Sequence, residues 1–144
     1  MEVKSHTRWV EGMKFVGAGW SGHEVVMDAN TESGGDDCGA RPMELLLVGL
    51  AGCTGMDVVS LLRKMRVPFT GIELSVSADK SEEHPSVFTA IRLEYVVRGR
   101  GVDPEKVKKT IELSQERYCS VSAMLKKACP VEYSFRIEGP DKSD

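Results

Sequence analysis

The stretch PMELLLVGLAGCTGMDVVSLLRKMR, from Pro42 to Arg66, decides the fold. Pro42 suits the first turn of a helix, where its missing N–H costs nothing, and Glu44 favours the positive end of the helix dipole. Three basic residues complement the negative end: Arg63, Lys64 and Arg66. Pro68 then stops the helix. The stretch therefore predicts one long helix from Pro42 to about Arg66.

This helix is apolar nearly all round. Its apolar residues do not fit one stripe: Leu45, Leu46, Leu47, Val48, Leu50, Val58, Val59, Leu61 and Leu62. Gly49, Gly52 and Gly55 recur at three-residue steps and leave a shallow groove. Each glycine costs about 1 kcal/mol relative to alanine in a helix, a cost that close packing of another helix would offset. One small domain cannot easily cover such a helix on every side, so we expect a second copy of the chain to help.

The same helix is close to the length that crosses a membrane, but polar side chains interrupt it. They are Glu44, Thr54, Asp57 and Ser60. Carboxylates at that depth in lipid are costly, so a buried helix of a soluble protein is the better interpretation.

Strands are expected on both sides of the helix. The N-terminal part predicts strands at Thr7–Val10, Met13–Val16 and Glu24–Asp28, and the Gly- and Asp-rich segment Thr31–Arg41 predicts a loop. After the helix, strands are predicted at Thr70–Ala78 and Val87–Val97, on either side of the polar loop Asp79–Pro85. The first of them alternates apolar and polar residues as a half-buried strand does.

Two shorter helices and a last strand complete the prediction. Asp103 and Pro104 are an N-cap and a first-turn proline and open a helix. One face of this helix carries Val107, Ile111, Ser114 and Tyr118. A third helix is expected over Ser120–Cys129 and a strand over Val131–Ile137. The pattern predicts an α+β fold, with a single domain over residues 1–138 and a frayed tail over 139–144.

Composition excludes several classes of partner. The chain has 144 residues, with 19 basic against 22 acidic side chains and a formal charge of -3. No basic cluster suits nucleic acid or an anionic membrane surface. Met1–Gly12 has no apolar core of a signal peptide, which favours a cytoplasmic location. Because that compartment is reducing, we do not expect the cysteines to form structural disulfides.

The spacing of the cysteines argues against a metal site. They occupy positions 38, 53, 119 and 129, and no C-x-x-C motif is present. His6, His23 and His84 are far apart in the sequence. No Walker loop, Rossmann fingerprint or G-x-S-x-G elbow occurs, so neither a metal nor a cofactor is expected.

Chemistry then depends on individual cysteines. Cys53, within the apolar helix, could be a small core residue or a reactive thiol. Cys119 lies where the third helix begins, and free N–H groups there would stabilise a thiolate and lower its pKa. Cys119 could equally be a capping neighbour. Cys38, in the acidic loop, and Cys129, before Pro130, are interpreted as incidental.

A family resemblance connects these features. Arg41–Cys53 (RPMELLLVGLAGC) resembles the central-helix signature of the OsmC/Ohr proteins, a Pro, an acidic residue and a small or apolar run that ends in Cys. Tyr118–Val121 also resembles the family, with a second Cys opening a later helix, and the order of elements matches. The resemblance implies an OsmC-like fold in which strands wrap a long central helix, assembled as an intertwined homodimer.

The resemblance also implies a reaction. The Cys53 thiolate would reduce a hydroperoxide and become a sulfenic acid, which Cys119 would resolve as a disulfide. An external dithiol would then reduce that disulfide. We therefore expect a thiol-dependent peroxidase of oxidative-stress defence, with Cys53, Cys119 and Glu44 as its catalytic residues.

The carboxylate and the arginine of the family pattern are displaced. Active relatives place a carboxylate directly after the Pro, where this chain has Met43, so Glu44 points roughly 180° from Cys53 on an ideal helix. Residues 14–28 contain no arginine to hold the thiolate; Arg8 and Arg41 are possible replacements.

Asp57 lies one helical turn after Cys53, on the same face. An unpaired carboxylate there would raise the pKa of the thiol. Asp57 is therefore either paired with a cation or caps a buried group.

Two alternatives to the peroxidase remain. One is a non-catalytic or weakly redox-active dimer that binds a small apolar ligand in the groove between its subunits. The other is a thiol-based sensor that forms its disulfide without turnover.

Overall fold

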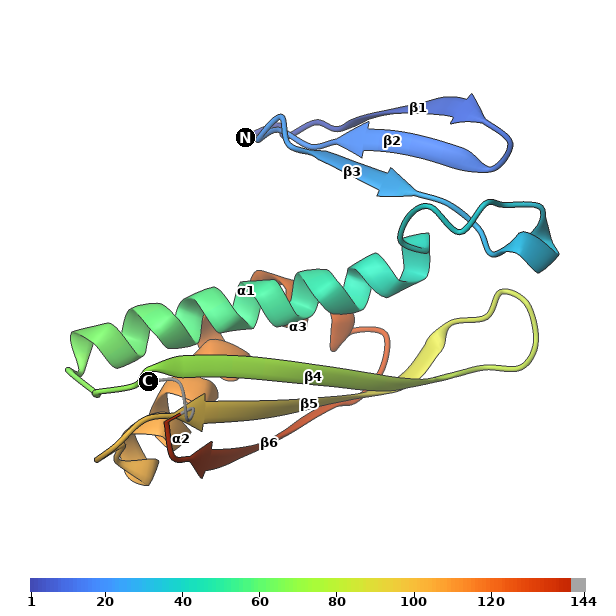
Figure 1. Cartoon of the computed structure of the whole chain (residues 1–144). Helices are drawn as coiled ribbons and strands as arrows, with labels where there is room; N and C mark the ends of the chain where they lie inside the picture. The colour runs from blue at the N-terminus through green and yellow to red at the C-terminus, as the bar shows by residue number, and fades with distance from the viewer. Residues whose placement is uncertain (141–144) are drawn as a thin grey trace. The chain divides into compact units, whose positions relative to one another are not determined.

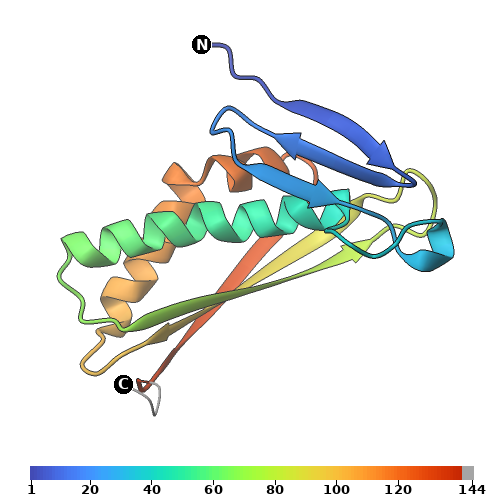
Figure 2. The ribbon, with the colours of Figure 1, turned by 45° about the horizontal axis from the view of Figure 1, so that its top comes forward.

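A computed structural model describes residues 1–140 and divides the chain into two compact units, Met1–Leu46 and the residues from Leu47 onward (Figures 1 and 2). Of the predicted tail, Gly139 and Pro140 have no regular structure, and residues 141–144 lie outside the described part. The prediction of a single domain over residues 1–138 stays a prediction.

The N-terminal unit is built on a three-stranded antiparallel sheet of order β1-β2-β3. Its strands are β1 (His6–Glu11), β2 (Lys14–Ala18) and β3 (Glu24–Met27), each within about two residues of the predicted range. A short 3-10 helix, η1 (Thr31–Ser33), lies in the predicted loop. Helix α1 (Pro42–Lys64) begins in this unit and continues through the second.

The second unit contains the sheet β4 (Gly71–Lys80), β5 (Phe88–Arg98) and β6 (Val131–Glu138). β4 and β5 are antiparallel, whereas β6 pairs with β5 in parallel. A parallel pair needs a crossover connection. Here the crossover consists of helix α2 (Pro104–Leu113), the π-helical segment η2 (Ser114–Tyr118) and helix α3 (Ser120–Leu125).

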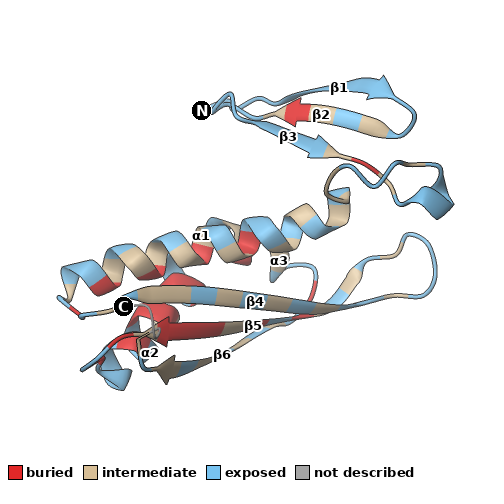
Figure 3. Cartoon of the chain, in the orientation of Figure 1, coloured by how far each residue is buried: buried red, intermediate tan, exposed pale blue. Residues whose placement is uncertain are grey.

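The core of this unit lies between one face of the sheet and the helices (Figure 3). α1 contributes Leu50, Val58 and Leu62, which are fully buried and, together with the buried Thr54, repeat about once per turn. They pack with alternate residues of β5 and with one face of α2: Ile91, Leu93, Tyr95, Val97, Val107 and Ile111. By length and composition α1 could also cross a membrane, but this face makes it a core helix.

Two predictions in the crossover are wrong. Tyr118 does not continue the buried face of α2 but is 50% exposed, because the wider π-turn of η2 changes the register of the side chains. The third helix ends at Leu125 rather than Cys129, since the chain continues as a turn before Pro130.

Candidate functional site

The structure brings two cysteines together from distant parts of the sequence. Cys53 lies in the middle of α1 and is half-buried, while Cys119 is the buried N-cap residue of α3. Both are free thiols, and Cys53 lies close enough to Cys119 to raise the pKa of its thiol. Neighbouring thiols are the groups that oxidation can join as a disulfide.

Burial raises the pKa of the Cys119 thiol to about 11. The Ser122 N–H, which donates to Cys119 Sγ at 3.4 Å, lowers the pKa, but the Cys53 thiol and the charge of Asp57 raise it further. The expected lowering at a helix start is therefore present and is outweighed, since Cys119 is only 3% exposed. Near neutral pH Cys119 therefore keeps its proton.

This burial predicts a loss of stability in alkaline solution. Burial also raises the pKa of Tyr95 to about 12, although the hydrogen bonds of its hydroxyl with Thr54 and Gln115 lower it. In the folded protein the pKa of Cys119 lies above its ordinary value of 9.0, and that of Tyr95 above its ordinary value of 10.0. Their contribution to the free energy of unfolding is therefore complete below pH 9 and is lost as the pH rises through the folded-state pKa values.

We expect the free energy of unfolding in urea to fall by roughly 2–3 kcal/mol as the pH rises from about 9 to about 11. Tyr95→Phe should give a shallower fall between about pH 10 and pH 12, because it removes one of the two groups. A flat profile in the wild-type protein would contradict this prediction.

A buried hydrogen-bond network lies beside the dithiol pair. Thr54 Oγ1 is its centre, 2.7 Å from Tyr95 OH, 2.7 Å from Ser114 Oγ and 3.1 Å from Gln115 Nε2. Gln115 Oε1 accepts from Ser122 Oγ at 2.7 Å. All five residues are buried, and no buried side-chain N or O atom within residues 1–140 lacks a partner. Such a network fixes side-chain positions because an unmade bond there is costly.

Sequence reasoning missed this network. In the sequence, Thr54 was visible only as a polar interruption of an apolar helix, and Ser114 only as one member of a shared helix face. Gln115, Tyr95 and Ser122 gave no signal, because polar residues in short helices and strands are usually exposed.

Asp57 caps a buried hydroxyl, which is the second of the two alternatives considered for it. Its Oδ2 accepts from Ser114 Oγ at 2.8 Å. It also lines a polar pocket of about 310 Å³ with Ser60, Leu61, Lys64 and Tyr118. Asp57 thus joins the network to the surface beside the cysteines.

Glu44 and the candidate arginines are held by local contacts. Glu44 Oε1 accepts from the Arg41 N–H at 2.9 Å, the reciprocal half of a capping box at the start of α1. The Arg41 guanidinium pairs with Asp37 at 2.7 Å, and Arg8 lies 3.7 Å from Glu24. A catalytic role for Glu44 stays a prediction, while its capping role is clear.

The other two cysteines have ordinary surroundings. Cys38 is exposed, in a loop that Asp28 anchors by accepting from the N–H groups of Ala29, Asp36 and Cys38. Cys129 is buried among core residues just before β6. Within residues 1–140, no group of three or more His, Cys, Asp or Glu side chains could hold a metal ion.

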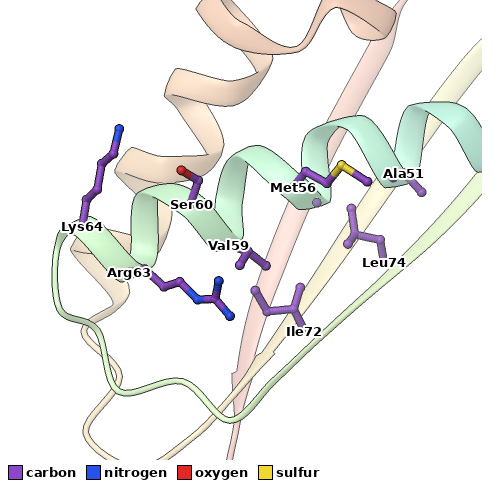
Figure 4. Close-up of a pocket in the computed structure, with 10 residues that line it drawn as sticks. Ala51, Met56, Val59, Ser60, Arg63, Lys64, Ile72 and Leu74 are labelled. Atoms are coloured by element: carbon purple, nitrogen blue, oxygen red, sulfur yellow. The ribbon is translucent and has the colours of Figure 1, made fainter. Parts of the chain in front are cut away.

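An apolar groove of about 620 Å³ lies between α1 and β4 (Figure 4). Met56 and Val59 of α1 face Ile72 and Leu74 of β4, and Arg63 lies at one end (Figure 4). At Gly55 a Cβ would lie 3.3 Å from Leu74 Cδ1, so a larger residue there would require the Leu74 side chain to shift. At Gly49 and Gly52 a Cβ would meet nothing within 4 Å.

The fold and the paired thiols together define a class of α+β dithiol protein, and the comparisons name it. Residues 34–134 match the family of OsmC-like proteins, and the chain belongs to that family. Protein YhfA of Escherichia coli K12 is 37% identical over 135 residues, which cover 94% of this chain and 98% of YhfA.

Solved structures have the same fold as this chain. The crystal structure of a hypothetical protein from Aquifex aeolicus VF5 superposes with a TM-score of 0.84 at 28% identity, covering 98% of this chain and 99% of that chain. An organic hydroperoxide resistance protein OsmC from Legionella pneumophila superposes with a TM-score of 0.69 at 13% identity, covering 94% and 96%. The latter likeness concerns the fold alone.

Proposed function

We propose that this protein is a thiol-dependent peroxidase that reduces hydroperoxides in oxidative-stress defence. The observation that carries the proposal is the pair of neighbouring free thiols within an OsmC-like fold, Cys53 on α1 and Cys119 at the start of α3. The name of the Legionella pneumophila structure, an organic hydroperoxide resistance protein, supports the choice of substrate class. Because free thiols are its working state, we place the protein in the reducing cytoplasm.

The proposed reaction has two chemical steps. The Cys53 thiolate attacks one oxygen of the hydroperoxide, so that an S–O bond forms, the O–O bond breaks and an alcohol leaves after taking up a proton. Cys119 then attacks the Cys53 sulfur of the sulfenic acid. An S–S bond forms, the S–O bond breaks, and the Cys119 proton leaves with the hydroxide as water.

An external dithiol closes the cycle by exchange with the disulfide. The test is consumption of an organic hydroperoxide, and separately of hydrogen peroxide, by the whole protein with dithiothreitol as reductant. We expect steady-state consumption above the rate of dithiothreitol alone. Oxidation of a single equivalent without turnover would indicate a thiol sensor instead.

The outer face of α1 supports a homodimer. Met56 is 76% exposed and Val48 62% exposed, and Gly49 and Gly52 leave open space beside them. Such a surface on a soluble protein usually faces a partner. We propose that a second copy of the chain covers it, as the predicted intertwined homodimer requires.

The dimer makes a direct prediction. Sedimentation at micromolar concentration should give twice the chain mass. Gly52→Leu should shift the protein toward monomer, because the leucine side chain would occupy the space in which the second copy packs against α1. The matched control is Glu132→Leu, which introduces the same side chain at an exposed position on β6. This variant should remain a dimer. A stable wild-type monomer contradicts this assembly.

The apolar groove favours a second candidate function, binding of a small apolar ligand. Its volume of about 620 Å³ is within the range of small-molecule sites. This candidate requires no turnover of Cys53, so the hydroperoxide assay separates it from the peroxidase.

A further inference from the structure

In the buried network, the donor and the acceptor of each hydrogen bond can be assigned in one consistent way. The Ser114 hydroxyl donates its only proton to Asp57, so its bond with Thr54 requires Thr54 as the donor. The proton of Thr54 is then used, and Tyr95 must donate to Thr54. The chain of donors therefore runs from Tyr95 through Thr54 and Ser114 and ends on the Asp57 carboxylate.

Gln115 joins the same network to the cysteine end of α3. Its amide group donates to Thr54 and Tyr95, and its Oε1 accepts from Ser122 Oγ. The Ser122 N–H in turn donates to Cys119 Sγ. One set of hydrogen bonds thus fixes both the carboxylate and the thiol.

Asp57 is also linked to both cysteines through the backbone. It lies one turn after Cys53 on α1, on the same face. It holds Ser114, whose carbonyl accepts from the Cys119 N–H at 2.7 Å. The negative charge of Asp57 is therefore anchored beside the dithiol pair rather than free to turn into solvent.

We propose that Asp57 is a positioning residue that assigns the roles of the two cysteines: its anchored charge disfavours a thiolate on Cys119 and leaves Cys53 to carry the negative charge. The asymmetry comes from burial. A charge interacts more strongly with a buried group than with one that water screens, and Cys119 is buried while Cys53 is half-buried. The raised pKa of Cys119, to which Asp57 contributes, agrees with this assignment.

Other titratable or charged groups surround this site, and the test must separate them from Asp57. They are Cys53 and Lys64 on α1, Tyr95 on β5, Tyr118 on η2, Cys119 at the start of α3, and Lys126 just after it.

The inference rests on the proposed function for its purpose, because it explains which thiol meets the peroxide. While Cys119 keeps its proton, it can donate S–H to the Cys53 thiolate. The same proton is then available to leave as water when the disulfide forms. The proposal itself concerns the titration of two thiols, which can be measured whether or not the protein turns over peroxide.

The experiment follows the 13C chemical shift of each cysteine Cβ with pH in the reduced whole protein, with signals assigned by single Cys→Ser variants. Asp57→Asn keeps an acceptor for Ser114 and removes the charge. We expect the Cys119 midpoint to fall, giving at least about threefold more Cys119 thiolate at a fixed pH, with a smaller change at Cys53. Asp57→Glu, which restores the charge, should return the Cys119 midpoint toward wild type.

Glu112→Gln on α2 is the matched control, since it removes one negative charge outside the network and should leave both midpoints in place. If Asp57→Asn does not fold, Ser114→Ala, which releases the carboxylate, should lower the Cys119 midpoint in the same direction. An unchanged Cys119 midpoint, or an equal or larger shift at Cys53, overturns the proposal. Loss of turnover with the expected shifts intact would instead count against the peroxidase function.

Discussion

Cys53→Ser is expected to abolish hydroperoxide consumption, lowering it to the rate of the dithiol alone. Serine cannot supply a thiolate-like nucleophile near neutral pH, and the neighbouring thiol of Cys119 is buried and holds its proton. The measurement is steady-state peroxide consumption with dithiothreitol, at equal concentrations of folded protein.

Cys119→Ser should behave differently. It should consume one equivalent of peroxide and then carry a sulfenic acid on Cys53 that a dimedone-type probe traps. At excess peroxide this species should over-oxidise, because no resolving thiol remains. Cys38→Ser and Cys129→Ser are controls and should turn over close to wild type. A probe adduct on Cys119, with turnover retained in Cys53→Ser, would reverse the assigned roles.

Thr54→Val is expected to cost about 3 kcal/mol of unfolding free energy, a large loss for an isosteric change. Thr54 Oγ1 is bonded to Tyr95, Ser114 and Gln115, and the variant leaves each of these buried groups with one partner fewer. The measurement is equilibrium unfolding in urea, at a pH below the titration of Cys119 and Tyr95.

Thr110→Val is the matched control. Thr110 is equally buried, but its hydroxyl makes a single bond to the Val107 carbonyl of its own helix. Its loss should cost about 1 kcal/mol, the usual value of one hydrogen bond. Equal costs for the two variants would show that the Thr54 network adds nothing to the stability of the fold.

Most of the fold could be predicted because its elements carry local signals. Pro42 and the basic residues near Lys64 set the ends of α1, and alternation set β4. The π-helical segment η2 could not be predicted, since a single widened turn leaves no trace in the period of apolar residues. It is this turn that exposes Tyr118 and places Ser114 and Gln115 against α1.

The candidate site was predictable only through its cysteines. Cys53 and Cys119 could be paired because a family pattern connects them, whereas spacing alone left both assignments open. The environment of Cys119 was misjudged in one respect: the helix-start N–H is there, but burial dominates its pKa. Burial of a single side chain depends on contacts between α1, β5 and α3 that no local pattern encodes.

Cys53 and Cys119 are 66 positions apart, so a covalent bond between them closes a loop that contains β4, β5 and α2. Closing a loop of that length removes enough freedom from the unfolded chain to stabilise the folded one by about 4 kcal/mol in the chain-entropy model. Oxidation of the two cysteines would then make the protein more resistant to unfolding and to proteases. The protein would be longest-lived in a cell at the moment when its reductant is exhausted.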